Sequence, residues 1–349
     1  RIVLDRLGEE GAAWIVGGWV RDRIAGKDSE DLDLGSNLIP SEVESAFPRS
    51  IMVGEEFGTV LVRVEDSKGR DFQCEVTTLR KDGGYTDGRR PDNVIFGNDI
   101  EEDLARRDFT INAMAIEPMK GLVGAECPAG KLIDLDGRGI KDLESGLLRT
   151  VGQAEKRIRE DGLRIVRAFR FLDLGEGGLR ELDPELSIAI SSNLPMLSKV
   201  SKERIWNELQ KILSCSNSMR IVESMVEHGI LEEVLPGISI NTDANQSDDH
   251  IVNLALICRD EGATGPEISE KIGSLLRLSG KESSELSILH EYRKIELDSS
   301  VESVRRFSAT MSDMQRSQIL DYMRGSGTDT AYFESKLGQN YDLKAGPRP

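Results

Sequence analysis

Short apolar runs alternate with glycine-rich turns over residues 1–125, and this pattern predicts a small α/β domain. Residues 13–16 form an apolar run that ends at two glycines, and residues 19–25 behind it have helical periodicity. Acidic and apolar side chains alternate over residues 31–34, as expected for a half-buried strand. We therefore expect a small mixed sheet with helices, in which two further β-rich runs form strands over residues 58–64 and 72–79.

From residue 126 onward the pattern is helical. Apolar residues recur with the spacing of an amphipathic helix over residues 154–174, 202–213, 219–228 and 252–258. The predicted fold class is an α+β head followed by an all-α neck, body and tail. We expect three domains, which are a head of residues 1–125, a neck of residues 126–215, and a body and tail of residues 216–349.

Composition excludes several broad classes of protein. The 349 residues are 38% hydrophobic and 31% charged, which is typical of a soluble globular chain. No run of about 18 apolar residues occurs, so we expect no membrane-spanning helix. Four scattered cysteines and three histidines disfavour a disulfide framework, a zinc site and a histidine-based hydrolase. The scattered cysteines fit a reducing compartment, and we expect a cytoplasmic location.

The charge of the chain is large and unevenly distributed. The formal net charge is −17, from 45 basic and 62 acidic residues, which disfavours a simple nucleic-acid coat protein. Residues 149–171 nevertheless hold seven basic and three acidic residues. This local basic segment is compatible with an RNA partner.

Two acids stand close together near the start of the chain. Asp31 and Asp33 are separated by one residue, and on a strand this spacing puts both carboxylates on the same face. Adjacent carboxylates repel each other unless a cation lies between them, and Mg²⁺ prefers oxygen ligands. The pair predicts a metal site, although two solvated surface acids would give the same pattern.

A candidate phosphate site precedes this pair. Gly17 and Gly18 end a predicted strand just before a helix, where free backbone N–H groups and the helix dipole favour an anion. Arg21 lies on the first turn of that helix. The alternative is an ordinary glycine turn beside a surface arginine. The spacing fits neither a P-loop nor a dinucleotide-binding motif.

These residues, with three later segments, resemble the motifs of a known enzyme family. Residues 17–22 and 31–33 resemble the first motif of the class II tRNA nucleotidyltransferases and poly(A) polymerases, which belong to the DNA polymerase β superfamily. The second motif, the hinge motif and the nucleotide-selecting motif follow in the family's order, at residues 106–114, 134–143 and 160–164. The resemblance covers residues 13–235. It implies a template-independent RNA nucleotidyltransferase, most simply one that adds CCA to the 3′ end of tRNA from CTP and ATP and releases pyrophosphate.

The resemblance assigns roles to the head residues. Asp31 and Asp33 would hold two Mg²⁺ ions, with Glu75 as the third acid and Asp71 as its competitor on the same strand face. The other head residues that the resemblance places at the nucleotide are Gly17 and Gly18 at the phosphates, Arg21, Arg107 at the triphosphate, Asp108 at the ribose 2′-hydroxyl, and Asn112 in support of that contact.

The nucleotide-selecting motif would read the pairing edge of the base. Asp161 would accept a hydrogen bond from the amino group of cytosine or adenine, and Arg164 would donate one to the ring nitrogen. The alternative is a plain ion pair at i, i+3 on one continuous helix. The resemblance gives Arg167 and Arg170 further nucleotide contacts.

Three more features complete the expectations. Gly137 and Gly139 of the hinge motif would let the head move, or simply form a connecting turn. Residues 82–91 resemble the flexible loop that serves the final A-addition. The members of this loop that we expect to act are Tyr85, Asp87, Arg89 and Arg90. A basic tract for tRNA phosphates would include Arg157, Lys202 and Arg204.

Three alternatives share most of these features. An A-adding enzyme and a poly(A) polymerase would carry the same four motifs, and a catalytically inactive relative would bind RNA without turnover. The intact acid pair argues against the inactive relative, because a binding module has no use for it. We expect no membrane partner, and the sequence indicates no protein partner.

Overall fold

The computed structural model describes residues 2–29, 31–54, 58–65, 68–82, 94–119, 130–260, 262–293, 300, 303–304, 307 and 312–337. The chain divides into two compact units. Unit 1 comprises Arg1–Arg164 and Arg180–Asn193, and unit 2 comprises Ile165–Leu179 and Leu194–Pro349. The domain boundaries expected at residues 125 and 215 fall inside these units, and the three-part division stays a prediction.

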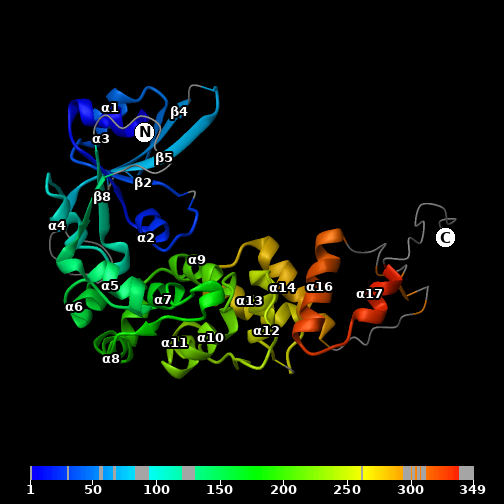
Figure 1. The fold of residues 1–349 in the computed structure, drawn as a ribbon. Helices are drawn as coiled ribbons and strands as arrows, with labels where there is room; N and C mark the ends of the chain where they lie inside the picture. Colours follow the sequence, from blue (N-terminus) through cyan, green and yellow to red (C-terminus); the bar gives the residue numbers. More distant parts are fainter. Residues whose placement is uncertain are drawn as a thin grey trace. The chain divides into compact units, whose positions relative to one another are not determined.

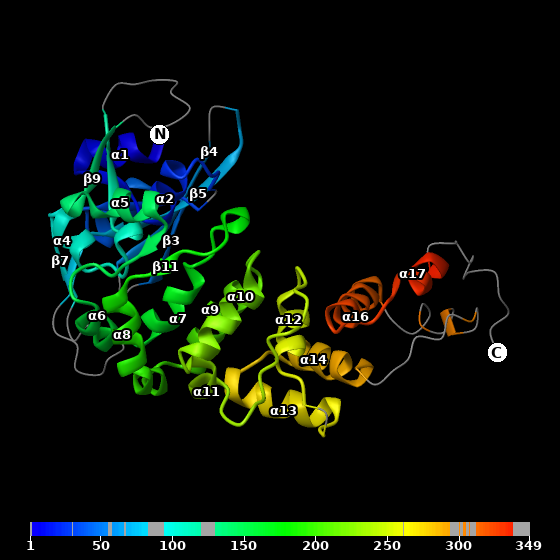
Figure 2. The same cartoon turned by 60° about the horizontal axis from the view of Figure 1, so that its bottom comes forward.

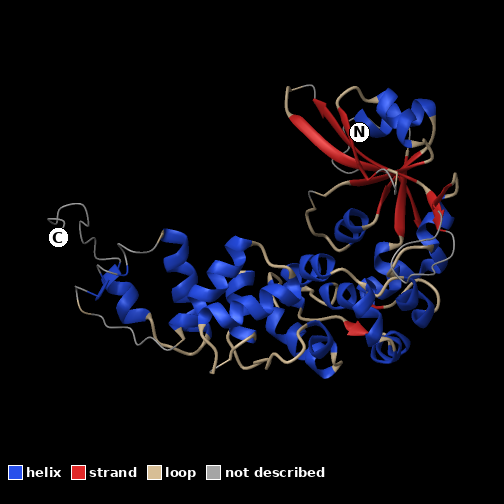
Figure 3. Cartoon of the chain, turned by 180° about the vertical axis from the view of Figure 1, so that it is seen from behind, coloured by secondary structure: helices blue, strands red, loops and turns tan. Residues whose placement is uncertain are grey.

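A seven-stranded sheet forms the framework of unit 1 among the described residues (Figures 1 and 3). Its strand order is β3-β4-β5-β2-β1-β8-β9, and of its strand pairs β2 and β5 run parallel while the others run antiparallel. The strands are β1 (Ala13–Val16), β2 (Asp33–Ser36), β3 (Ser50–Gly54), β4 (Thr59–Glu65), β5 (Asp71–Thr78), β8 (Met114–Pro118) and β9 (Gly130–Asp134).

The core of unit 1 lies on both faces of this sheet. All four residues of β1 are buried, as expected for a central strand covered on both sides. Ile15 belongs to the cluster that also holds residues of α1 and α3, whereas Trp14 and Val16 belong to the cluster that holds residues of α4. Alternate residues of β1 therefore pack into two different cores, one on each face of the sheet, and this fixes the register of the strand.

Short helices and ribbons complete unit 1. Two-stranded pairs are formed by β6 (Arg80–Asp82) with β7 (Val94–Phe96) and by β10 (Leu147–Leu148) with β11 (Glu181–Leu182). The helical elements are α1 (Ile2–Glu10), α2 (Gly18–Ile24), α3 (Pro40–Ala46), α4 (Ile100–Ala105), η2 (Thr110–Asn112), η3 (Leu135–Gly137), α5 (Arg138–Ser145), α6 (Ala154–Glu160) and α8 (Pro184–Ser192).

The regular elements in the described part of unit 2 are helices, together with an isolated bridge between Asp173 and Leu179. Figure 2 shows α13 and α14 side by side. The boundary between the units falls within α7 (Leu163–Arg170). The other helices of unit 2 are η4 (Gly175–Gly177), η5 (Leu194–Lys199), α9 (Lys202–Leu213), α10 (Ser218–Glu227), α11 (Ile230–Val234), α12 (His250–Ile257), α13 (Gly265–Leu276), α14 (Gly280–Tyr292), α16 (Asp313–Gly325) and α17 (Ala331–Leu337).

The predicted fold class is confirmed, with two local corrections. The helix expected over residues 154–174 is broken, because α6 ends at Glu160 and Asp161 adopts extended backbone with φ −149° and ψ 109°. The strand expected over residues 31–34 begins only at Asp33, so Asp31 lies before β2. Within the described ranges, no helix is long and apolar enough to cross a membrane.

Candidate active site

The predicted acid pair lies at the start of β2, in the middle of the sheet. Asp33 is the first residue of this strand, and its Cα is paired with Val16 on β1 and with Glu75 on β5. Asp31 and Asp33 are both exposed. The fold thus brings Glu75, forty-two positions later in the sequence, beside the acid pair.

Burial and the neighbouring charges act on the carboxylate of Asp33. The pKa of Asp33 is raised, first by partial burial of its carboxylate and then by the negative charges of Glu75 and Asp31. The Arg107 guanidinium lowers it, although by less than burial and Glu75 together raise it. A cation at this point would relieve the repulsion between the acids, which is the behaviour expected of a metal or phosphate-bound metal site.

The register of β5 favours Glu75 over Asp71 as the third acid. Glu75 lies on the exposed face of β5, opposite Asp33, while Cys74 and Val76 point into the core. Asp71 lies four residues away at the other end of the strand and pairs with Arg49 at 3.0 Å. Burial raises the pKa of the Cys74 thiol to about 12, so this cysteine is an inert core residue.

Gly17 lies where a side chain would collide with Arg107. Its backbone has φ 73° and ψ −135°, a combination that is essentially restricted to glycine. A Cβ at this position would lie 2.9 Å from Nη1 of Arg107 and 4.0 Å from Oδ2 of Asp33. The absent side chain therefore lets an arginine and an acid approach the same turn.

Arg21 connects the first motif to the second. Its guanidinium donates to both carboxylate oxygens of Asp22, at 2.8 and 2.9 Å, and Nη1 donates to Oδ1 of Asn112 at 2.7 Å. Asn112 in turn donates to Oδ1 of Asp108 at 3.4 Å. Asp108 and Asn112 are 9% and 6% exposed. These four residues form one polar network that begins on α2, the helix that follows Gly17.

Asp103 is a buried residue of this site that the sequence analysis missed. Its side chain is 2% exposed and accepts from Arg106 through Oδ1 and from Arg107 through Oδ2. Burial alone would raise the pKa of Asp103, but the charges of Arg106 and Arg107 outweigh it, so the net pKa is lowered. The spacing Asp103, Arg106, Arg107 at i, i+3 and i+4 was the available signal.

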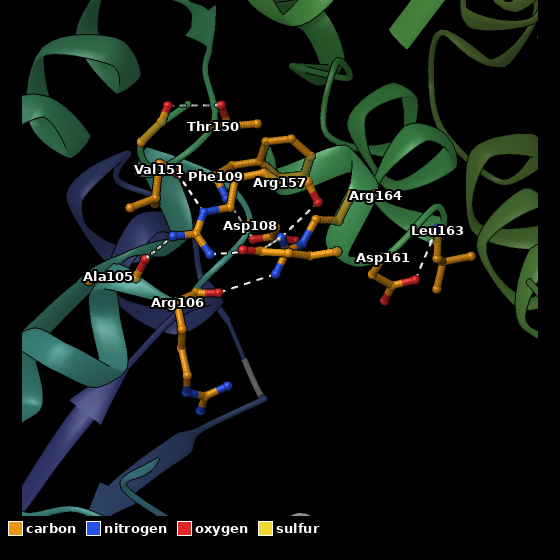
Figure 4. Close-up of polar contacts among 12 residues, drawn as sticks. Ala105, Arg106, Asp108, Phe109, Thr150, Val151, Arg157, Asp161, Leu163 and Arg164 are labelled. Carbon is orange, nitrogen blue, oxygen red and sulfur yellow. Dashed lines mark hydrogen bonds and ion pairs between the residues drawn. The ribbon is translucent and has the colours of Figure 1, made fainter. Parts of the chain in front are cut away.

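The nucleotide-selecting motif lies at the break between α6 and α7 (Figure 4). Arg164 is 8% exposed, and its Nη1 donates to Oε2 of Glu160 at 2.7 Å and to the Arg157 carbonyl at 2.8 Å. Its Nη2 donates to the Arg106 carbonyl at 3.2 Å. The ion-pair partner of Arg164 is thus Glu160, and the continuous helix that would align Arg164 with Asp161 is absent from this described segment.

Asp161 lies two residues before α7 instead of within a longer helix. Its Oδ1 accepts from the Leu163 backbone N–H at 3.0 Å, and its carbonyl accepts from the Arg164 N–H at 3.0 Å. These bonds fix the orientation of the turn from which both side chains project. They stabilise the first turn of α7, in the way that capping carboxylates do.

Arg157 has internal partners on all three guanidinium nitrogens. Nε donates to the Val151 carbonyl, Nη1 to Glu160 and Nη2 to the Ala105 carbonyl, at 2.8, 2.8 and 3.0 Å. These contacts give Arg157 a structural role at the α6–α7 break, and RNA binding by Arg157 stays a prediction.

The hinge motif is tightly packed against the second motif. Asp134 accepts from the backbone N–H groups of Gly139 and Ile140 at 2.8 and 3.0 Å. A Cβ on Gly139 would lie 2.7 Å from Cγ of Met114, so this glycine is required for packing. Thr110 donates to the buried carboxylate of Asp142 at 2.7 Å. Hinge motion at Gly137 and Gly139 stays a prediction.

Comparison with known proteins identifies the family. Residues 13–149 match the model of the poly A polymerase head domain, and residues 181–241 match that of the probable RNA and SrmB-binding site of polymerase A. The CCA-adding enzyme of Geobacillus stearothermophilus is 39% identical over 239 residues, and that of Lactobacillus gasseri is 41% identical over 237 residues.

The chain belongs to the class II CCA-adding enzyme and poly(A) polymerase head family. The two alignments cover 68% and 67% of this chain and 54% of each relative, so the chain spans about half the length of these curated relatives. The resemblance drawn from the four motifs is confirmed.

Solved structures of family members share the fold over nearly the whole chain. The Bacillus stearothermophilus CCA-adding enzyme in complex with CTP is 29% identical, with a TM-score of 0.76, and the match covers 97% of this chain and 80% of that one. The Thermotoga maritima CCA-adding enzyme complexed with tRNA matches with a TM-score of 0.65 over 99% of this chain and 86% of that one. At 19% identity, the second match shows the fold alone.

Several residues expected at the nucleotide or RNA belong to unit 2. Arg167 and Arg170 contact the buried carboxylate of Glu208 at 3.3 and 3.0 Å. Both guanidinium groups also lie over the Phe171 ring. Lys202 is exposed and donates to the Ser274 carbonyl at 2.9 Å. Nucleotide binding by the first two, and RNA binding by Lys202 and Arg204, stay predictions.

The flexible loop is largely outside the described residues. Tyr85, Asp87, Arg89 and Arg90 fall in the range 83–93, which the structure does not describe. The two ends of this segment are strands β6 and β7, whose paired residues include Arg80 with Phe96 and Asp82 with Val94. The first residue of the loop expected over residues 82–91 is a strand residue, because Asp82 belongs to β6.

Proposed function

We propose that this protein adds CCA to the 3′ end of tRNA, one nucleotide at a time, from CTP and ATP and without a nucleic-acid template. The observation that carries this proposal is the approach of Asp33 and Arg107 to Gly17, with Glu75 paired beside Asp33. Two carboxylates that repel each other thus lie side by side, and the Arg107 guanidinium approaches the turn at Gly17 because this residue has no side chain. These residues lie within the segment 13–149 that matches the poly A polymerase head domain. The chain is 39% and 41% identical to two CCA-adding enzymes over 239 and 237 residues.

The chain's own residues fit the triphosphate and its metal ions. Mg²⁺ is commonly bound by one or two carboxylates together with substrate phosphates. Among the described side chains, no group of three or more His, Cys, Asp or Glu residues is arranged to hold a metal without such help. The pair Asp31 and Asp33 would hold the ions together with the phosphates. When bound, two such ions stabilise negative charge on the attacking and leaving oxygens.

The transfer itself is a simple exchange of phosphorus–oxygen bonds. The 3′-hydroxyl oxygen of the tRNA bonds to the α-phosphorus, the bond to the β-phosphate breaks, and pyrophosphate leaves while the hydroxyl proton passes to water. Arg107 would contact the triphosphate, and the network of Arg21, Asn112 and Asp108 would hold the ribose 2′-hydroxyl. Orientation by these groups converts a bimolecular encounter into a positioned reaction.

Base selection would depend on Arg164 and Asp161. Three N–H donors of Arg164 are used by Glu160 and by two backbone carbonyls, which fixes the plane of the guanidinium group. A fixed donor suits cytosine and adenine, whose ring nitrogen accepts, and opposes uracil and guanine, whose ring N–H would leave a polar group unpaired. This selection is part of the proposal.

One experiment tests the proposal and separates it from its relatives. Purified protein is incubated with three tRNAs that end at the discriminator base, at C or at CC, with CTP and ATP supplied separately and together, and the products are sized on denaturing gels. A CCA-adding enzyme extends the first two with CTP and only the third with ATP. If ATP is incorporated and CTP is incorporated into none of the three tRNAs, the protein is an A-adding enzyme or a poly(A) polymerase. No extension of any tRNA contradicts the proposal.

A further inference from the structure

We propose that Asp103 is a positioning residue that holds one edge of the Arg107 guanidinium, so that the opposite edge faces the space beside Gly17 and Asp33. This inference rests on the proposed function, in which Arg107 contacts the triphosphate. Asp103 itself lies behind the arginine and contacts no reacting atom. Its role is to fix which nitrogen the nucleotide meets.

The hydrogen bonds divide the guanidinium into two edges. Nε and Nη2 of Arg107 donate to Oδ2 of Asp103, at 3.3 and 3.1 Å. Nη1 lies on the other side, 2.9 Å from the position that a Cβ would take at Gly17. Oδ2 of Asp33 lies 4.0 Å from the same Cβ position. The edge held by Asp103 is therefore occupied, and the edge toward Gly17 is presented to the site.

The Asp103 carboxylate is buried and therefore needs positively charged partners. The Asp103 side chain is 2% exposed, while that of Arg107 is 22% exposed, so the carboxylate has almost no access to water and the arginine has some. An ionised carboxylate in such a place requires charged partners. Its two oxygens satisfy this requirement with two different arginines, since Oδ1 accepts from Nε and Nη2 of Arg106 at 3.0 and 2.5 Å.

Through Arg106 and the backbone of Arg80, the Asp103 carboxylate is also connected to β6. Nε of Arg106 donates to the Arg80 carbonyl at 3.2 Å, and the Arg80 N–H lies 3.4 Å from Oδ1 of Asp103. A merely structural role for Asp103 would act through this second arginine and β6. The two roles differ in one respect, because only the positioning role requires Arg107.

A double-mutant cycle distinguishes the two roles. CTP affinity is measured by calorimetric titration for the full chain, for Asp103→Asn, for Arg107→Gln and for the double variant. We expect Asp103→Asn to weaken CTP binding about tenfold or more in the parent chain, because it removes charge from a charge-assisted hydrogen bond. In the Arg107→Gln background we expect the same change to alter CTP affinity by less than about twofold, as for residues that act as one unit.

The controls keep the result interpretable. Glu101→Gln removes a negative charge from an exposed position of the same helix, and we expect CTP affinity to stay as in the parent chain. If thermal melting shows that Asp103→Asn does not fold, Asp103→Glu, which retains the charge and shifts the carboxylate, replaces it in the cycle with the same expectation.

Equal loss of CTP affinity in both backgrounds would overturn the positioning role. So would unchanged affinity for a folded Asp103 variant in the parent chain. A different outcome marks failure of the proposed function itself, namely that the parent chain does not bind CTP or that Arg107→Gln leaves CTP affinity unchanged.

Discussion

Replacing Gly17 by alanine tests whether the turn at this residue exists to admit Arg107. The new Cβ would lie 2.9 Å from Nη1 of Arg107, whereas ordinary van der Waals contact begins at 3.4 Å. The guanidinium would therefore have to move by about 0.5 Å. The backbone at φ 73° and ψ −135° would also become strained, because this region is essentially restricted to glycine.

The two effects predict separate magnitudes. Backbone strain should lower the free energy of unfolding by about 1–3 kcal/mol. A misplacement of about 1 Å can cost a hundredfold in rate, so a shift of half that size should lower kcat/KM for CTP incorporation about tenfold. We measure the first by urea denaturation and the second by steady-state incorporation into a tRNA that lacks CCA.

Gly178 provides a matched control. Its backbone, with φ 84° and ψ −131°, is nearly that of Gly17, but a Cβ there would make ordinary contact, 3.4 Å from Nη1 of Arg220. Gly178→Ala should therefore lose a similar free energy of unfolding and retain kcat/KM. The reasoning is refuted if Gly17→Ala keeps the parent kcat/KM, or if both variants lose kcat/KM equally.

Three further predictions concern single changes in the head. Asp33→Asn should abolish incorporation yet raise the free energy of unfolding at neutral pH. Burial and Glu75 raise the pKa of Asp33, so the native chain binds that proton more tightly than the unfolded chain and loses stability as pH rises through the raised pKa. The stability that Asp33→Asn gains should therefore vanish below about pH 4 in urea titrations. A gain in the free energy of unfolding that persists below that pH would contradict this reasoning. Thr110→Val should cost about 1–3 kcal/mol in urea denaturation, because the buried Asp142 loses a donor at 2.7 Å, and an unchanged midpoint would argue against that contact. Shortening residues 83–93 should stall products after two cytidines on sizing gels, and complete CCA formation would remove the loop from the switch to ATP.

Strong local patterns were sufficient to predict the central elements. The apolar run ended by glycines became β1 over Ala13–Val16, and the amphipathic stretch became α9 over Lys202–Leu213, with the predicted bounds. Edge strands such as β3 and β9 were missed, because short strands near the end of a sheet need little alternation of apolar and polar residues. The sheet order also required long-range pairing that no local pattern encodes.

For the site, too, local patterns could be read from the sequence and long-range contacts could not. Strand alternation assigned Asp31 and Asp33 to one face of their strand. It left Glu75 and Asp71 as competitors on one face of theirs. The parallel pairing of β2 with β5, which no local pattern predicts, places Glu75 beside Asp33.

The break at Asp161 was missed, because apolar residues on both sides keep helical spacing while the backbone turns. The partners of Arg164 were missed for this reason, and Asp103 because burial of an acid is a tertiary property.

The most direct test of the central claim is a crystal structure of the protein with CTP and Mn²⁺, in which anomalous scattering locates the metal. The account predicts Mn²⁺ bound by oxygens of Asp31 and Asp33 and by the triphosphate, with Nη1 of Arg107 against a phosphate oxygen. A triphosphate bound elsewhere, with both carboxylates facing bulk solvent and no metal beside them, would contradict it.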